Sequence, residues 1–445
     1  MYMKKKKEIE EAEEEKIKYV NSAGKFEEGL VVEMINDDEC TKYLYSNDGQ
    51  EVGEMYSYEG DDNVVYLPYQ KTNSLIQNHI VEFPSGITDY EDFDELLKSI
   101  RVFIHTYVDI PEDFEIVCSY YVVLSWVYDR FHEVPYLPVI GDYGTGKSRL
   151  IKTVGNLCYR PIKTTGATNP AGIFRILNDI QGTLLLDEAD FRYNDTTETI
   201  IKILNSGYEK GSPLIRMEAN KNGALQIKSF KVYGPKIIGT REPFTDKALE
   251  SRCFTEHMGM SSIREDIPRN LDDGFYSQAT HIRNMLLSYR FECLQTPVNG
   301  QSELISGIHP RLQQIALPML QIMKNNEHRT IFKAYMRKQN DELIADRSDN
   351  WEAEIVKILL AIKSQNVDQA SIKDISVLLN KHRDPDEPLW NPKKVGWLIK
   401  KKLSLTRTRI TRGYVVSITE NAHKVDMYRE RFGITEQDIQ VYLEK

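Results

Sequence analysis

The sequence predicts an α/β fold, with an open-sheet core at residues 134–260, a helical lid, N-terminal β-rich and helical regions, and a C-terminal winged helix. Two observations predict the core. A glycine-rich segment, residues 141–148, lies between a short apolar run and a helix-forming segment. A second apolar run ends in two adjacent carboxylates, Asp187 and Glu188. Alternating buried strands and helices are typical of an open parallel sheet, whose ligands bind at the carboxyl ends of the strands.

The glycine-rich segment reads Gly-Asp-Tyr-Gly-Thr-Gly-Lys-Ser, the pattern of a phosphate-binding loop. The apolar run Tyr136–Ile140 before it favours a buried strand, and residues 149–154 after it favour a helix. Glycines let backbone N–H groups approach a phosphate, and the helix N-terminus favours the anion. We therefore expect the loop to bind ATP, with Lys147 on the β- and γ-phosphates and the Ser148 hydroxyl on Mg²⁺. The residues expected to hold the nucleotide are Gly141, Gly144, Thr145, Gly146, Lys147 and Ser148.

The carboxylate pair follows residues 183–186, an apolar run suited to a buried parallel strand. Its acids would then face the same ligand as the loop. We expect Asp187 to hold Mg²⁺ and Glu188 to orient or deprotonate the attacking water. A glycine turn can arise by chance, and acidic pairs often follow strands at protein surfaces. Together, however, the two motifs predict an ATP hydrolase in which Lys147 and Glu188 take part in catalysis.

The composition narrows the other possibilities. The five scattered cysteines contain no Cys-x-x-Cys pair, so we expect neither disulfides nor a zinc site. No apolar run has membrane-spanning length and no secretory signal begins the chain, so we expect a cytoplasmic protein with no membrane partner. Residues 1–65 hold 18 acidic and 8 basic side chains, against 67 and 57 in the whole chain, so the net charge of −10 lies there. The overall acidity is therefore no argument against nucleic-acid binding.

The segments around the core differ in their patterns. Short β-prone runs separated by turn residues precede it, and helical periodicity both borders and follows it. A polar stretch then separates a C-terminal unit. The predicted domains are a charged arm (1–24), a small β-rich domain (25–75), a helical region (76–133), the core (134–260), a helical lid (261–342), a linker (343–350), a winged helix (351–420) and a tail (421–445).

A β-hairpin is predicted within the second half of the core. Residues 213–218 and 224–228 both read as strands, and the turn signal Asn220–Gly223 joins them. Lys221 would lie near the tip. The hairpin is either an exposed surface turn or an element that touches a ligand.

The order of these and the following motifs resembles that of the AAA+ ATPases. In that family a polar residue ending the next core strand senses the γ-phosphate, and Thr240 has this place, although asparagine is commoner there. Ser251-Arg252-Cys253 resembles the motif of clamp loaders and MCM helicases whose arginine acts on ATP bound to the neighbouring subunit. A structural salt bridge is the alternative for Arg252. Arg311, at a helix start, resembles the second sensor arginine of MCM-like lids, or else makes no nucleotide contact.

The closest general resemblance is to MCM-like replicative helicases of mobile genetic elements. It implies that the hairpin projects into a ring pore, where Lys221 would hold a DNA phosphate. It also implies a homo-oligomer, expected to be a hexamer, because Arg252 needs a neighbour. Such a ring would use ATP and Mg²⁺ to translocate along single-stranded or forked DNA and unwind it during replication. The alternatives are an AAA+ loader or remodeller that binds DNA without unwinding it, and a regulatory NTP switch with no DNA partner.

The C-terminal unit has the element order of a winged helix. Residues 351–363 show helical spacing, Asn391-Pro392 is a good helix start, and Arg407–Ile418 alternates like a hairpin. Residues 381–412 carry ten basic and three acidic side chains, so phosphate contacts are expected there. A protein-binding winged helix with a solvated basic face is the alternative. The expected DNA contacts in this unit are Lys393, Lys394, Lys400, Arg407, Arg409 and Arg412.

Overall fold

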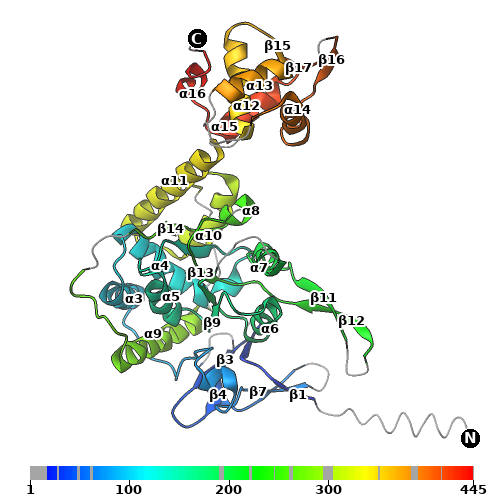
Figure 1. The fold of residues 1–445 in the computed structure, drawn as a ribbon. Coiled ribbons are helices and arrows are strands. Elements are labelled where there is room, and N and C mark those ends of the chain that lie inside the picture. The colour runs from blue at the N-terminus through cyan, green and yellow to red at the C-terminus, as the bar shows by residue number, and fades with distance from the viewer. Residues whose placement is uncertain are drawn as a thin grey trace, which may run out of the picture. The chain divides into compact units, whose positions relative to one another are not determined.

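The computed structural model divides the chain into two compact units, residues 1–336 and 337–445, and each is described by itself (Figure 1). The structure describes most of the chain, with gaps. These are residues 18–27, 30–47, 51–60, 64–189, 195–219, 223–244, 246–259, 264–293, 304–348, 351–381, 389–411 and 413–443. In this part of the chain, no helix combines the length and the apolar character needed to cross a bilayer.

Five parallel strands form the central sheet of the first unit, in the order β14-β8-β13-β10-β9. Strands β8, β10 and β13 are buried along almost their whole length, as expected of a sheet covered on both faces. Parallel pairing brings the carboxyl ends to one edge, where Thr240 lies opposite Ile140. The predicted α/β core with a parallel sheet is therefore confirmed. The strands are β8 (Tyr136–Ile140), β9 (Ile162–Thr165), β10 (Leu184–Asp187), β13 (Lys236–Thr240) and β14 (Glu256–His257).

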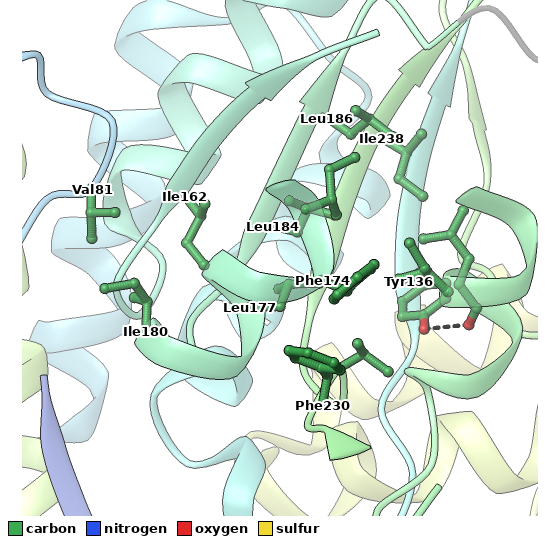
Figure 2. Packing of buried hydrophobic residues seen from close by; sticks show 14 of the residues in the cluster. Val81, Tyr136, Ile162, Phe174, Leu177, Ile180, Leu184, Leu186, Phe230 and Ile238 are labelled. Atoms are coloured by element: carbon green, nitrogen blue, oxygen red, sulfur yellow. Dashed lines mark hydrogen bonds between the residues drawn. The ribbon is translucent and has the colours of Figure 1, made fainter. Parts of the chain in front are cut away.

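Helices lie on both faces of this sheet (Figure 1). Helix α4 is apolar all round and buried from Phe114 to Trp126, because it packs against α3, α5, α9 and α10. Figure 2 shows the opposite face, where Phe174 and Leu177 of α6 lie in one buried cluster with Leu184 of the sheet. The helices are α2 (Ser74–Gln77), α3 (Phe93–Tyr107), α4 (Glu112–Trp126), η1 (Tyr128–Arg130), α5 (Lys147–Leu157), α6 (Pro170–Ile180), α7 (Asp195–Ser206), α8 (Lys247–Glu250), α9 (Asp273–Glu292), α10 (Pro310–Ile322) and α11 (Asn326–Ser348).

The N-terminal strands form two small sheets, with the orders β2-β3-β4-β5 and β1-β7-β6. In the described part of these sheets, buried side chains share a core with the central sheet: Val32 and Tyr43 belong to the same buried cluster as Ile162. The predicted separate β-rich domain is thus part of the first unit. Of the predicted arm, residues 1–24, the first 17 residues lie outside the described part of the chain. The strands are β1 (Lys18–Asn21), β2 (Gly24–Glu27), β3 (Leu30–Asn36), β4 (Thr41–Asn47), β5 (Gly53–Met55), β6 (Tyr58–Glu59) and β7 (Val64–Leu67).

A buried ion-pair cluster fixes the N-terminal sheet to the core. The carboxylate of Glu33 in β3 accepts hydrogen bonds from Arg160 Nη2 at 2.6 Å and Arg290 Nε at 2.6 Å. The Tyr159 hydroxyl donates to the same carboxylate at 2.8 Å. Removing one partner of such a buried pair typically costs about 3–5 kcal/mol, because it leaves an uncompensated charge in the interior.

The structure differs from the prediction where the predicted lid meets the predicted linker. Helix α11 runs to Ser348, so most of the predicted linker, residues 343–350, is the last part of a helix. Leucine, alanine and arginine are good helix formers, so the polar composition of this segment alone did not end the helix. The predicted hairpin is present as β11 (Leu214–Ala219) and β12 (Leu225–Phe230), paired antiparallel.

The second unit has the order helix, strand, helix, helix, strand, strand. Asn391 caps α14 by accepting from Lys394 N at 2.9 Å, and Pro392 takes the first helical position. The predicted tail instead forms two helices, α15 and α16, whose Val425 and Ile439 join the core of this unit. The elements are α12 (Trp351–Ser364), β15 (Gln369–Ser371), α13 (Ile372–Lys381), α14 (Pro392–Lys401), β16 (Thr408–Ile410), β17 (Gly413–Ser417), α15 (Ala422–Arg431) and α16 (Glu436–Gln440).

Candidate functional site

A cleft of about 360 Å³ opens at the carboxyl edge of the central sheet. Residues 143–149, residues 187–189 and residues 239–243 line it. Three segments that are far apart in sequence therefore meet here, because the parallel strands β8, β10 and β13 end at the same edge. Of the predicted site residues, the cleft brings together Gly144, Thr145, Gly146, Lys147, Ser148, Asp187, Glu188 and Thr240.

The glycine loop has the backbone that its sequence requires. Gly144 and Gly146 have φ values of 76° and 93°, in the left-handed region that disfavours side chains. Gly146 is also the N-cap of α5, so the N-terminus of that helix opens onto the cleft. Gly141 lies just outside the lining, and a Cβ there would meet Met258 O and Thr145 Oγ1 at 2.7 Å. The loop is thus built for close approach of an anion to the backbone.

Lys147 is the cation of this loop. Its ammonium group donates to the carbonyl oxygen of Asp142 at 2.6 Å and also to that of Gly141. Partial burial lowers the pKa of Lys147, and the positive charge of Arg241 lowers it further. A phosphate in the cleft would offer this ammonium group a better partner than two neutral carbonyls.

The carboxylate pair occupies a constrained backbone. Asp187 Oδ1 accepts from Glu188 N at 2.9 Å. Glu188 has a φ of 53°, which is uncommon for a non-glycine residue and often marks a functional site. Two glycines leave room for the pair: a Cβ on Gly239 would lie 3.0 Å from Asp187 Oδ1, and one on Gly166 would lie 2.3 Å from Glu188 O.

The cleft has a donor set that suits Mg²⁺. This ion prefers oxygen ligands and is usually held by one or two protein groups together with substrate phosphates. The Ser148 hydroxyl and the Asp187 carboxylate both line the cleft and supply oxygen ligands of that kind. The absence of a side chain at Gly239 keeps the Asp187 carboxylate accessible, so these residues fit a phosphate-bound magnesium ion.

Thr240 ends β13 and lies between the loop and the carboxylate pair. Its hydroxyl group donates to Glu242 O at 3.0 Å, and its backbone carbonyl accepts from Gly141 N at 3.2 Å. The residue is buried but lines the cleft, so its hydroxyl group belongs to the same site as Lys147 and Asp187.

Arg252 lies at the opposite edge of the sheet. Its carbonyl accepts from the backbone N–H of Tyr136, the first residue of β8, whereas the glycine loop follows the last residue of that strand. The Arg252 side chain is only 8% exposed, donates to Asn205 Oδ1 and stacks 4.1 Å above the Tyr208 ring centroid. It therefore cannot reach the cleft of its own chain, and its predicted action on a neighbour would require it to leave this pocket.

Arg311 does not line the cleft either. It is exposed in the first turn of α10, and its Nη1 donates to Ser251 Oγ at 3.4 Å. Arg311, predicted as a nucleotide contact from the lid, therefore lies at the amino edge beside Ser251, the neighbour in sequence of Arg252, which was predicted to act on the ATP of the adjoining subunit. A contact of Arg311 with nucleotide in its own chain finds no support in this geometry.

The predicted DNA contacts are partly described. Lys221 and Arg412 lie outside the described residues. Lys393, Lys394 and Lys400 are exposed on α14, and Arg409 is exposed on β16. Arg407 is half-buried: its guanidinium group donates to Gly396 O at 2.9 Å and stacks 4.8 Å above Tyr414. Arg407 therefore joins the hairpin to α14, so its predicted role as a phosphate contact is weakened.

Three residues that the sequence analysis did not select belong to these surfaces. Arg241 and Tyr143 line the cleft at the carboxyl edge of the sheet. Trp397 is 53% exposed on α14, one helical turn from Lys393 and from Lys400. The sequence offered two signals for these residues. One was a basic residue directly after a core strand, and the other was an aromatic residue among lysines on an amphipathic helix.

No protein-family model and no curated protein matches this chain. Its five-stranded parallel sheet is typical of an AAA+ core, and its fold is distantly similar to several solved structures. The apo C-terminal region of NrS-1 is 11% identical with a TM-score of 0.35, and the match covers 87% of this chain and 95% of that one. Cch of SCCmec type IV, an active helicase, is 12% identical with a TM-score of 0.32, covering 91% and 99%. Cdc6p of Pyrobaculum aerophilum is 13% identical with a TM-score of 0.22, covering 78% and 99%. At these identities and TM-scores the likeness is distant and carries no argument about this chain.

Proposed function

We propose that the chain is a ring-forming AAA+ ATPase that couples ATP hydrolysis to translocation along DNA and its unwinding, as a replicative helicase of a mobile element does. The observation that carries this proposal is the meeting of Lys147, the Asp187–Glu188 pair and Thr240 at one cleft. A cation, two carboxylates and a hydroxyl group around a helix N-terminus are the groups that phosphoryl transfer from a nucleotide requires.

Each side chain would act on one part of the reaction. The Lys147 ammonium group leaves its two loop carbonyls and binds the β- and γ-phosphates. The Glu188 carboxylate orients and deprotonates the attacking water. The Thr240 hydroxyl group turns from Glu242 O to the γ-phosphate. When bound, Mg²⁺ neutralises charge on the phosphate oxygens, and Ser148 and Asp187 are the residues that hold it.

The position of Arg252 supports an oligomer. A cation at the amino edge of the sheet cannot act on its own cleft, but a second copy can bring it to a phosphate. A repeated head-to-tail contact of this kind closes into a ring when the rotation between copies allows it. We therefore propose a homo-oligomeric ring, with a hexamer as the expected size.

One described surface supports a nucleic-acid partner. The hairpin β11–β12 projects beyond the core (Figure 1), but its exposed residues Ile215, Met217 and Ile227 are apolar and bind no phosphate, so the support comes from the second unit. Helix α14 presents lysines around the exposed Trp397. Lysines bind phosphates, and an exposed indole stacks on bases, so this helix suits DNA better than an uncharged protein partner.

A forked-DNA assay tests the proposal. Wild-type chain with ATP and Mg²⁺ should displace the labelled strand, and Lys147→Ala should abolish both displacement and ATP hydrolysis. Single-stranded DNA should stimulate hydrolysis several-fold. If ATP is hydrolysed and DNA stimulates hydrolysis but no strand is displaced at saturating protein, the loader or remodeller function replaces the helicase. Hydrolysis that ignores DNA altogether would favour the regulatory switch.

Variants of the second unit test the DNA surface separately. Lys400→Ala should weaken DNA binding a few-fold and reduce the slope of log affinity against log salt by about one. Trp397→Ala should remove the tryptophan quenching expected on binding and weaken single-stranded DNA by about tenfold. Lys363→Ala, on α12 and paired with Asp426, is the matched control and should leave both unchanged. Equal affinities for all four proteins would reject α14 as the DNA surface.

A further inference from the structure

Arg241 and Tyr143 form a pair at the mouth of the nucleotide cleft. The guanidinium carbon of Arg241 lies 3.7 Å from the Tyr143 ring centroid, and Nη2 donates to the Tyr143 hydroxyl oxygen. Both side chains are exposed, Tyr143 by 68%. In the part of the chain that the structure describes, no carboxylate lies within ion-pair distance of this guanidinium group. A cation–π contact at an exposed site is weak, so the arginine is held loosely.

The fold places this arginine at the phosphate end of the cleft. Arg241 directly follows Thr240, the last residue of β13, and β13 lies between β8 and β10. The glycine loop follows β8, and Asp187 ends β10. Arg241 therefore leaves the sheet between the two motifs, and it lines the same cleft as Lys147 and Glu188.

The charges in the cleft indicate what Arg241 would bind. Lys147 and Arg241 are close enough for the arginine charge to lower the lysine pKa. The two cations thus repel each other, the carboxylates of Asp142 and Asp187 offset only part of this effect on Lys147, and a polyphosphate bound between them would relieve the repulsion. Among the described cations lining the cleft, Arg241 alone carries a planar fork that is free of backbone carbonyls, and such a fork matches phosphate oxygens in two parallel hydrogen bonds.

We propose that Arg241 recognises the γ-phosphate of a nucleotide bound in its own chain, and that Tyr143 holds the guanidinium group while that phosphate is missing. This rests on the proposed function of the cleft as an ATP site. The pair then acts as a discriminator between nucleoside triphosphate and diphosphate: the triphosphate takes the arginine from the tyrosine ring, and the diphosphate leaves the pair in place. Arg241 would contact the terminal phosphate from the same subunit, whereas Arg252 would arrive from another.

The test is a titration of the full chain with a fluorescent non-hydrolysable ATP analogue and with fluorescent ADP, both with Mg²⁺. Wild type should prefer the ATP analogue. Arg241→Gln should weaken the analogue by about tenfold and change ADP affinity less than twofold, because only the terminal phosphate loses its partner. Arg241→Lys should keep part of the preference, since the charge remains without the fork. Arg337→Ala, an exposed arginine on α11, is the matched control.

Tyr143→Ala separates the two roles. It should keep or increase the preference for the ATP analogue, because the arginine is freed and the phosphate contact is intact. Equal weakening of both nucleotides by Arg241→Gln, or no weakening, overturns the proposal. The proposal is also overturned if Tyr143→Ala loses the preference for the ATP analogue as completely as Arg241→Gln does. Failure of the ATP site itself is a different result: wild type would bind neither nucleotide, or Lys147→Ala would bind both as tightly as wild type.

Discussion

Arg241 and Arg252 lie at opposite edges of the same parallel sheet and are held in opposite ways. Arg241 is exposed at the carboxyl edge and rests on the exposed ring of Tyr143. Arg252 is buried at the amino edge, hydrogen bonded to Asn205 and stacked on Tyr208. The cleft can therefore receive a phosphate with small side-chain rotations. At the amino edge, Arg252 must first leave its contacts with Asn205 and Tyr208. The free energy needed to break these contacts would weaken the assembly of a ring.

The largest expected effect comes from removing the buried arginine. Arg252→Ala should lower ATP hydrolysis on the order of 10³-fold while leaving nucleotide affinity unchanged, because an arginine finger stabilises charge in the transition state of a neighbouring site. The measurement is steady-state hydrolysis beside equilibrium nucleotide binding.

Mixing two inactive variants tests whether this arginine acts between subunits. Lys147→Ala keeps Arg252, and Arg252→Ala keeps its own loop. A one-to-one mixture should regain activity at about a quarter of the subunit interfaces of a ring. If the mixture stays as inactive as its parts, or if Arg252→Ala hydrolyses ATP at the wild-type rate, Arg252 has only the structural role that its contacts with Asn205 and Tyr208 already give it.

Glu188→Gln changes only the cleft at the carboxyl edge of the sheet and leaves Arg252 intact. Hydrolysis should fall about 10²-fold or more, because an amide cannot accept the proton of the attacking water. Nucleotide binding and ring formation should persist, since neither depends on this carboxylate. Size-exclusion chromatography with a bound ATP analogue checks the second point. A variant that hydrolyses ATP normally would move the base role away from Glu188.

A smaller effect is expected from filling the space beside Asp187. In Gly239→Ala the added Cβ would lie 2.5 Å from Ile151 Cδ1 and 3.0 Å from Asp187 Oδ1, so the isoleucine and the carboxylate must shift. Overpacking of this kind costs about 1–3 kcal/mol. We expect roughly tenfold slower hydrolysis and a higher magnesium requirement, measured by titration of the metal. Gly86→Ala, where a Cβ meets nothing within 4 Å, is the control and should behave as wild type.

The two edges also differ in how far the sequence predicts them. The glycines and the carboxylate pair are local motifs, and parallel pairing alone brings Thr240 beside them, so the cleft could be predicted. The burial of Arg252 could not, because Asn205 and Tyr208 reach it through tertiary packing of α7. Arg241 carried only the weak signal of its place after a strand.

The predictions of the linker and of the C-terminal tail were incomplete for similar reasons. The linker prediction did not foresee a helix, because a polar composition is also compatible with the end of a helix, and α11 continues to Ser348. The tail prediction failed because short helices gain their stability from packing, here of Val425 and Ile439 in the second unit. A capping box formed by Thr435 and Asp438 was the available signal for α16.

The smallest expected effect concerns the release of Arg252. Asn205→Ala removes its hydrogen-bond acceptor, and Arg252 Nε already has no partner among the described atoms. A hydrogen bond to a charged group contributes about 1.5–3 kcal/mol, but the contact with Tyr208 remains in this variant, so hydrolysis should rise by no more than about tenfold at protein concentrations where rings are only partly assembled. Tyr208→Leu, which removes the aromatic face, should act in the same direction. Lys202→Ala, exposed on the same helix as Asn205, serves as the control. A loss of activity in Asn205→Ala that matches Arg252→Ala would mean that the buried position of the arginine is its working position.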